Sequence, residues 1–273
     1  MLKLGSMQLP DVSVMGVLNV TPDSFSDGGR YNSHDAALRQ AEKLISEGAS
    51  IVDVGGESTR PGSSAVGESE EIDRVVPVVE ALASELGATV SVDTTKSAVM
   101  RAAVSVGAAM INDVRALQDD GALEAAAELG VPVCLMHMQG MPRTMQDSPE
   151  YGDVVKDVYN FLEQRLAACE AAGIARDRIV LDPGFGFGKI VEHNLSLLKH
   201  LRRLKDLGQP LLAGLSRKST LGHITGREVD ARMPASIVTA AIAVQNGASI
   251  IRAHDVAETV DAIKVTRAVM EAK

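Results

Sequence analysis

A recurring glycine followed by a short apolar run is the feature that most constrains how this chain can fold. Such runs begin at Gly48, Gly87, Gly107, Gly130, Gly208 and Gly247, and a seventh glycine, Gly173, precedes the apolar run at 179–181 by a few residues. Glycine commonly ends helices because it tolerates the left-handed backbone conformation found there. A short apolar run bounded by turn residues is typical of a buried strand. Together with the apolar run at 12–18, the pattern predicts eight strands.

The spacing of these runs predicts that each strand is followed by a helix. Dividing 273 residues by eight gives about 34 residues, close to one strand–helix unit. Helical spacing of three and four links Ile72, Val75, Val79 and Leu82, with a kink or restart expected at Pro77. Parallel strands joined by right-handed crossovers can close on themselves. We therefore predict a single α/β fold, a TIM (β/α)8 barrel, with an open doubly wound sheet as the alternative.

Composition favours one domain over the whole of residues 1–273, because no linker, charge block or low-complexity run divides them. The apolar segments are too short and too often interrupted by charge to span a bilayer. The first residues lack the long apolar region of a secretory signal. Two isolated cysteines, Cys134 and Cys169, give neither a disulfide framework nor zinc spacing. A cytoplasmic protein is expected.

The net charge of −9 argues against broad binding to nucleic acids or anionic membranes, which requires a basic face. Five basic residues nevertheless follow predicted strands, namely Arg60, Arg217, Lys218, Arg252 and His254. A local cluster of this kind suits a small anionic ligand, and the loops after the last two strands of a barrel commonly bind phosphate.

Polar side chains follow nearly every predicted strand. They are Asn19, Asp53, Asp93, Asn112, Met136 with His137, Asp182, Ser216 to Lys218, and Arg252 to His254. Any one of them is more often a helix cap or a loop hydrogen bond than a catalytic group. In a barrel, however, all strand carboxyl ends meet at one rim. The set then predicts a site for a flat polar heterocycle joined to an anion, with carboxylates facing ring N–H groups.

The sequence DPGFGFGK after the predicted strand at 179–182 alternates three glycines with Phe185 and Phe187. It is not a Walker phosphate loop, because Lys189 is followed by Ile190 rather than Ser or Thr, and it does not match GxGxxG. So many glycines predict backbone that passes close to a ligand.

Two further loops are predicted to form a lid, Asn19 to Ser33 and the loop that begins with ESTRPG at Glu57. No HExxH or other transition-metal motif is present. A magnesium ion held by Asn19 and by phosphates of the ligand is expected, since magnesium uses few protein ligands.

With these motifs assembled, the chain resembles the dihydropteroate synthase family over essentially its whole length. The motifs that carry the resemblance are NVTPDSFSDGG, DVGGESTRPG, SVDT, INDV, LMHMQG, LDPGFGFGK, LSRKS and IIRAHD, all in order. One departure is Thr220-Leu221-Gly222 after SRKS, where Phe or Met with Ile-Gly is more usual. It is expected to affect packing more than chemistry.

The resemblance implies that a dihydropterin carrying a hydroxymethyl pyrophosphate condenses with p-aminobenzoate, giving dihydropteroate and pyrophosphate. The pterin ring would contact Asp93, Asn112, Met136, Asp182 and Lys218. Pyrophosphate would contact Asn19, Thr59, Arg252 and His254, with Mg2+ near Asn19 and Asp53 in its outer shell. The p-aminobenzoate site would be shaped by Phe25, Arg60, Pro61, Phe187 and Ser216.

The resemblance further implies small-molecule substrates, a homodimer through late helices, and no nucleic acid or membrane partner. The catalytic residues would be Asn19, Lys218, Arg252 and His254. No residue would act as an essential nucleophile. Two alternatives remain at this point. One is a barrel that binds methyltetrahydrofolate and transfers its methyl group, and the other is a non-catalytic pterin- or phosphate-binding module.

Overall fold

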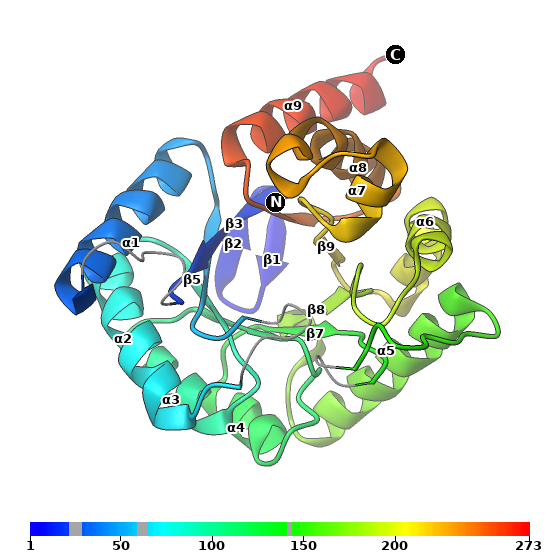
Figure 1. Cartoon of the computed structure of the whole chain (residues 1–273). Helices are drawn as coiled ribbons and strands as arrows, with labels where there is room; N and C mark the ends of the chain where they lie inside the picture. The colour runs from blue at the N-terminus through cyan, green and yellow to red at the C-terminus, as the bar shows by residue number, and fades with distance from the viewer. Residues whose placement is uncertain (22–28, 59–64, 141–143) are drawn as a thin grey trace.

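The fold is a closed ring of parallel strands surrounded by helices (Figure 1). The computed structural model describes residues 1–21, 29–58, 65–140 and 144–273, with the backbone alone for 29–33. The ring contains β3 (Ser13–Asn19), β4 (Ile51–Gly55), β5 (Val90–Asp93), β6 (Met110–Asp113), β7 (Val133–Met136), β8 (Ile179–Asp182), β9 (Leu212–Ala213) and β10 (Ile250–Ala253). Adjacent strands follow chain order from β3 to β8, and β10 lies between β3 and β9.

The ring closes between β8 and β9 through one parallel bridge, from Leu181 to Leu211. All other neighbours in the ring pair in parallel ladders. The predicted TIM barrel is thereby confirmed, and the open doubly wound alternative is wrong.

The helices of the described chain lie outside the ring, as Figure 1 shows. They are α1 (Gly29–Ser46), α2 (Glu68–Ser84), α3 (Ser97–Ser105), α4 (Ala122–Leu129), α5 (Val154–Ala171), α6 (Val191–Lys199), α7 (Ser219–Thr225), α8 (Met233–Gln245) and α9 (Val256–Glu271). Short 3-10 turns are η2 (Arg176–Arg178), η3 (Leu201–Leu207) and η4 (Val229–Ala231). No helix of the described residues has the length and hydropathy needed to cross a bilayer.

The glycines that predicted the repeat lie where a left-handed backbone is needed. All seven have positive φ, from 59° at Gly87 to 118° at Gly107. Residues with a Cβ adopt this region only at a cost, so glycine is required there. The expected restart at Pro77 is wrong, because α2 runs through that residue as one helix.

An apolar layer fills the amino-terminal end of the ring. The hairpin of β1 (Leu2–Leu4) and β2 (Met7–Leu9) crosses this end. Leu4 and Leu9 pack there against inward residues of the strands, namely Met15, Ile51, Met110, Cys134, Val180, Leu212 and Ile250. A separate, larger core lies between the strands and the helices. The closed lower end leaves the carboxyl ends of the strands as the open face.

Candidate active site at the carboxyl ends of the strands

Two positions beyond the apolar layer, the inward-facing residues become polar. Alternate residues of a strand share a face, so each apolar residue is followed two positions later by another that points inward. The pairs are Ile51 and Asp53, Met110 and Asn112, Val180 and Asp182, and Ile250 and Arg252. Asp93 ends β5 in the same way. The polar strand-end residues therefore converge at one rim.

Arg252 joins the acidic residues at the centre of this rim. Its Nε donates to Oδ2 of Asp53 at 2.7 Å, and its Nη2 donates to Oδ2 of Asp93 at 2.9 Å. The Asn112 amide donates to the same Asp53 oxygen at 3.0 Å. Asp53 is fully buried, and its charge is compensated mainly by the guanidinium. Arg252 is thus held by residues of two other strands, β4 and β5, and Asn112 on β6 in turn holds Asp53.

The carboxyl of Asp93 is set to gain or lose a proton near neutrality. Burial, and then the nearby charge of Asp53, raise its pKa to about 7, against the opposing effect of Arg252. Although burial alone would lower the pKa of Arg252, the carboxylates of Asp53 and Asp93 raise it further. Arg252 remains a cation at any ordinary pH.

Asp182 and Lys218 form the other side of the rim. The Asp182 carboxylate accepts a hydrogen bond from the Gly184 amide at 2.7 Å, and burial raises its pKa to about 6. Desolvation, with the nearby charge of Arg252, lowers the pKa of Lys218 to about 8. The Lys218 ammonium lies 4.0 Å from the ring centroid of Phe187, a cation–π contact.

His254 is oriented by Ser216. The Ser216 hydroxyl oxygen accepts from the backbone N–H of His254 at 3.1 Å and lies 3.0 Å from Nδ1. This contact fixes the orientation of the imidazole ring, with Nε2 on the side away from Ser216. Burial and the charge of Arg252 lower the pKa of His254 to about 4, so the ring is neutral at pH 7.

Arg217, which the sequence placed in the basic cluster, is already paired. Its guanidinium donates to both oxygens of Asp255, from Nε at 3.0 Å and from Nη2 at 2.5 Å. Its positive charge is therefore largely compensated, as that of Arg252 is by Asp53 and Asp93. The pair also ties the loop after β9 to the loop after β10.

Of the remaining expected site residues, the structure describes some and leaves four outside its described ranges. Asn19 ends β3 and is half-buried, whereas Met136 is buried beside Val114, Met138 and Met145, with Phe187 against the same cluster. Ser216 contacts His254, on the side expected for pyrophosphate, so its assignment to p-aminobenzoate stays a prediction. Four expected residues, Phe25, Thr59, Arg60 and Pro61, lie outside the described residues.

The glycines of the loop after β8 lie very close to other segments of the protein. Gly184, Gly186 and Gly188 have φ of 68°, 80° and 58°. A Cβ on Gly184 would lie 1.9 Å from the carbonyl oxygen of His137, and one on Gly188 would lie 2.5 Å from that of Gln139. Gly184 and Gly188 thus approach the loop after β7, Gly186 lies against the side chain of Lys218, and the expected approach to a ligand stays a prediction.

Sequence reasoning missed two residues that hold this loop, Lys189 and Asn194. Both are buried, and both hydrogen-bond to the loop backbone. A lysine that ends a glycine loop ordinarily faces solvent, and an asparagine in the first turn of a helix is unremarkable. No sequence signal marks either as buried.

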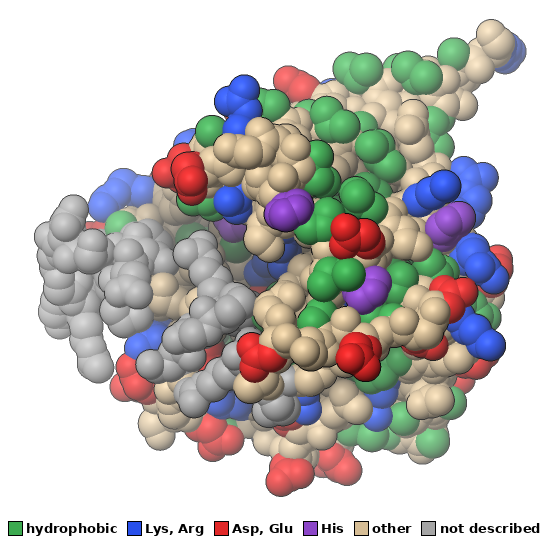
Figure 2. Space-filling model, turned by 45° about the vertical axis from the view of Figure 1, so that its right-hand side comes forward, with side chains coloured by type: hydrophobic (Ala, Val, Ile, Leu, Met, Phe, Trp, Pro, Cys, Tyr) green, Lys and Arg blue, Asp and Glu red, His purple; other side chains and the backbone are tan. Residues whose placement is uncertain are grey.

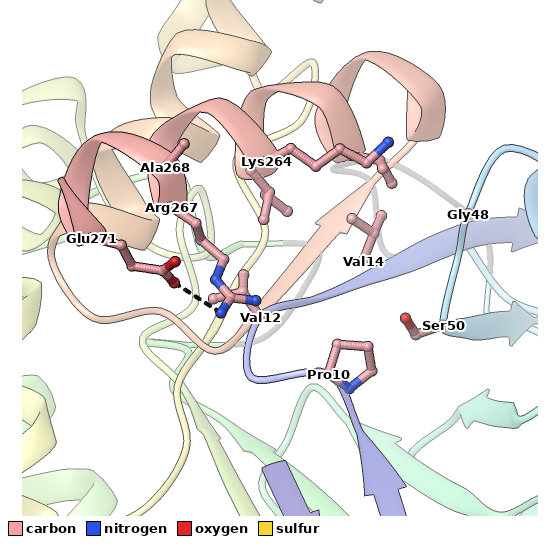
Figure 3. Close-up of a pocket in the computed structure, with 11 residues that line it drawn as sticks. Pro10, Val12, Val14, Gly48, Ser50, Lys264, Arg267, Ala268 and Glu271 are labelled. Atoms are coloured by element: carbon pink, nitrogen blue, oxygen red, sulfur yellow. Dashed lines mark hydrogen bonds and ion pairs between the residues drawn. The ribbon is translucent and has the colours of Figure 1, made fainter. Parts of the chain in front are cut away.

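A cavity of about 520 Å³ lies at the opposite end of the molecule, between α9 and the segment before β3 (Figure 3). Pro10, Val12 and Val14 line one side, and Lys264 and Arg267 the other, where Figure 3 shows Arg267 paired with Glu271. It is remote from the polar rim. Within the described ranges, no three His, Cys, Asp or Glu side chains are grouped to hold a metal ion.

Comparison with known proteins decides the family. Residues 15–254 match the family described as pterin binding enzyme. A dihydropteroate synthase of Escherichia coli K12 is 52% identical over 268 residues, covering 98% of this chain and 95% of that protein. The chain belongs to the dihydropteroate synthase family.

Solved dihydropteroate synthases share the fold over nearly the full length. The Yersinia pestis enzyme with a sulfonamide drug superposes with a TM-score of 0.94 at 51% identity, covering 99% of both chains. The Xanthomonas albilineans enzyme in complex with 7,8-dihydropteroate gives 0.89 at 48% identity, covering 98% of this chain and 97% of that one.

The chain is accordingly a transferase of folate biosynthesis. It condenses 6-hydroxymethyl-7,8-dihydropterin pyrophosphate with p-aminobenzoate and yields 7,8-dihydropteroate and pyrophosphate. Dihydropteroate synthases thus bind small molecules, as the barrel rim suggests. Membership of this family, at 52% identity to a dihydropteroate synthase, also favours the synthase reaction over the methyltransferase and the non-catalytic binding module.

Proposed function

We propose that the rim around Arg252 is where this dihydropteroate synthase carries out its reaction, with the pterin ring held by Asp93, Asn112, Asp182 and Lys218. The observation that carries the proposal is that the carboxyls of Asp93 and Asp182 and the amide of Asn112 meet at one rim, where Asp93 pairs with Arg252 and Asn112 donates to Asp53. Ring N–H and amino groups of a pterin are donors, and ionised carboxylates are their best acceptors. Met136, in the apolar cluster, would pack beside the ring.

Pyrophosphate would be bound by Asn19, Thr59, Arg252 and His254. The arrangement of His254 supports this assignment, because Ser216 occupies Nδ1 of its neutral ring and leaves Nε2 on the opposite side for a ligand. An arriving anion would raise the pKa of His254 and favour the protonated ring, which binds pyrophosphate more strongly. Arg252 adds a permanent positive charge.

Magnesium would bind beside Asn19, and the donor set fits this ion. The amide oxygen of Asn19 is a hard ligand at a half-buried position, and magnesium usually completes its octahedron with water and phosphate. Bound there, the ion would neutralise charge on the departing pyrophosphate. Asp53, proposed for the outer shell, also orients Arg252.

The p-aminobenzoate site would be formed by Phe25, Arg60, Pro61, Phe187 and Ser216. Phe187 supports this, because its ring borders the apolar Met136 cluster and carries the Lys218 ammonium on its face. An aromatic acid can thus find an apolar surface and a cation side by side. Sulfonamides would compete for the same place.

The reaction would pass through a cationic pterin methylene. The bond from the methylene carbon to the pyrophosphate oxygen breaks, and its electron pair leaves with pyrophosphate toward Arg252 and His254. The carboxylates of Asp93 and Asp182 stabilise the positive charge left on the pterin. The amine nitrogen then bonds to the methylene carbon and loses a proton. Positioning, rather than covalent catalysis, accounts for the rate.

A homodimer through the late helices is also proposed. Exposed apolar side chains gather there, namely Ile224 on α7, Val238 on α8, and Val265, Val269 and Met270 on α9. Figure 2 shows hydrophobic side chains along the edge that leads to the C-terminus. Contiguous apolar patches of this kind mark interfaces. Val238→Glu should shift a dimer toward monomer in sedimentation.

A single domain over residues 1–273 and a cytoplasmic location remain part of the proposal. One closed sheet uses strands from Ser13 to Ala253, which supports the first. A proteolysis fragment that folds alone and lacks part of the ring would contradict it.

The decisive experiment measures pyrophosphate release from the pterin pyrophosphate with magnesium, with and without p-aminobenzoate. Wild type should release pyrophosphate and form dihydropteroate, while Asp93→Asn and Asp182→Asn should bind the pterin weakly. Tight pterin binding without release would favour the methyltransferase or the binding module. Full activity in both variants would remove the rim from the proposal.

A further inference from the structure

The Lys189 ammonium lies beneath the glycine loop, at 3% exposure. It donates to the carbonyl oxygens of Gly184 and Phe187, each at 2.9 Å. It also lies 2.9 Å from Nδ1 of His137 and 3.3 Å from the His137 carbonyl oxygen. Its three N–H groups are therefore used entirely by the loops after β7 and β8.

These contacts make Lys189 an internal crosslink rather than a ligand group. The nearby ammonium and burial lower the pKa of His137, so the His137 ring is neutral and its Nδ1 can accept a hydrogen bond. Burial lowers the pKa of Lys189 to about 7, and the carboxylate of Asp182 opposes that effect. The three carbonyl contacts repay part of the desolvation of the ammonium.

Asn194, in the first turn of α6, completes the attachment on the other side of the loop. Its Oδ1 accepts from the Gly186 amide at 2.8 Å. Its Nδ2 donates to the Ile190 carbonyl at 2.8 Å and to Oγ1 of Thr220 at 3.1 Å. Thr220 belongs to α7, and Lys218 precedes the first turn of that helix. Asn194 therefore fixes the glycine loop relative to the segment that carries Lys218.

Phe187 lies between the two attachments. Its carbonyl oxygen is held by Lys189, and the preceding residue, Gly186, is held by Asn194. The Phe187 ring meets the Lys218 ammonium at 4.0 Å. Every hydrogen bond that the Lys189 ammonium makes within the described residues goes to the loops after β7 and β8, and the Asn194 side chain bonds to Gly186, Lys189, Ile190 and Thr220. Both residues can therefore act on the reaction through the position of Phe187 and Lys218, and Lys189 also acts through its charge near Asp182.

We infer that Lys189 and Asn194 are positioning residues that hold the Phe187 ring and Lys218 in register, and thereby align p-aminobenzoate with the pterin methylene. The inference rests on the proposed function. Alignment matters because misplacement of a reacting group by about 1 Å can cost about a hundredfold in rate. Two of the proposed pterin contacts, Asp93 and Asn112, come from strands that neither residue touches, whereas Asp182 and Lys218 adjoin the network, so pterin affinity should fall less than the rate of the reaction.

The test compares Lys189→Met and Asn194→Leu with wild type and with Lys199→Met, an exposed lysine on α6 that serves as the matched control. Circular dichroism establishes that each variant is folded. Steady-state kinetics then gives KM for p-aminobenzoate and kcat, and calorimetry with the pterin alone gives its Kd.

We expect both network variants to raise KM for p-aminobenzoate, or lower kcat, by about tenfold or more, with a clearly smaller rise in the Kd of the pterin. The control should match wild type. An unchanged KM and kcat would overturn the inference, as would an equal loss of pterin affinity, which indicates a general structural defect. If Lys189→Met fails to fold, Asn194→Leu alone decides. Absence of pyrophosphate release in wild type would instead refute the proposed function.

Discussion

The two ends of the barrel interior differ in chemistry although they are built from the same strands. At the amino-terminal end, Ile51, Met110, Val180 and Ile250 form a closed apolar layer. Two residues later on the same strands, Asp53, Asn112, Asp182 and Arg252 form the polar rim. The separation is two residues, about 6.6 Å along a strand. The difference shows that stability and chemistry are assigned to adjacent layers.

The layers also differ in what burial does. In the lower layer, burial removes apolar surface from water and favours folding. In the upper layer, burial takes the carboxyl groups of Asp93 and Asp182 out of water and raises the pKa of each, and the charge of Asp53 adds to the effect on Asp93. Burial of the upper layer therefore opposes folding, and the free energy gained by burying the apolar lower layer must offset that cost. Four substitutions test this division.

The largest effect should come from Arg252→Met, which removes the only group that pairs with both Asp53 and Asp93 within the described residues. We expect activity to fall by about a thousandfold or more. The free energy of unfolding should also fall by about 3–5 kcal/mol, because buried carboxylates lose their partner. Kinetics and urea unfolding at pH 8 measure the two effects. Retention of near-normal stability would show that the acids are compensated elsewhere.

Ile250→Ala, on the same strand in the lower layer, should affect stability alone. Loss of a fully buried side chain should cost about 2–5 kcal/mol. The Kd of the pterin should change by less than about threefold, as two residues separate the layers. Leu195→Ala, at a half-exposed position on α6, provides the control for a truncation outside the ring. A large loss of pterin affinity in a folded Ile250→Ala protein would contradict independent layers.

Pterin binding should depend on pH through Asp182. The ionised carboxylate accepts ring N–H donors, and its pKa of about 6 means that protonation grows below pH 6. Affinity should therefore fall as pH decreases, by about tenfold for each unit below that pKa. Calorimetry between pH 5 and 8 measures the slope. Asp182→Asn should bind more weakly but lose this step, while a step near pH 7 from Asp93 should remain.

The smallest effect should come from Ser91→Ala, in the lower part of β5. Ser91 is fully buried, and its hydroxyl has no hydrogen-bond partner among the described residues. Removing it should change the free energy of unfolding by less than about 1 kcal/mol, or raise it. Ser13→Ala is the matched control, because the Ser13 hydroxyl donates to the Pro10 carbonyl at 2.9 Å. Comparable destabilisation by both would show that Ser91 has a partner.

Much of the barrel could be predicted because its signal is local. The seven glycines and the apolar runs after them lie within a few residues of each other, and each reports one helix end and one strand. The convergence of Asp93, Asn112, Asp182 and Arg252 then follows from parallel strands. Pro77 misled because its local preference against a helix interior was overridden by packing of α2, where Val75 and Val79 are buried.

The missed features depend on contacts between distant segments. The hairpin of β1 and β2 is too short to be distinguished from a loop, and only the open end of the ring gives it a place to pack. Lys189 is buried because His137, 52 residues away, supplies two of its acceptors. The pairing of Arg217 with Asp255 likewise joins two loops that the sequence treats separately.

The closure between β8 and β9 has a consequence for native-state dynamics. The β9 strand has two residues, and the segment is joined to β8 by a single parallel bridge between Leu181 and Leu211, in which the Leu181 N–H donates to the Pro210 carbonyl at 3.0 Å. Amide hydrogen exchange by partial opening should be fastest where such ladders are shortest. Asp182 and Lys218 follow the two strands that flank this seam, on opposite sides. A bound pterin that contacts both would therefore connect the two sides of this short junction, and would slow its opening for as long as the pterin is bound.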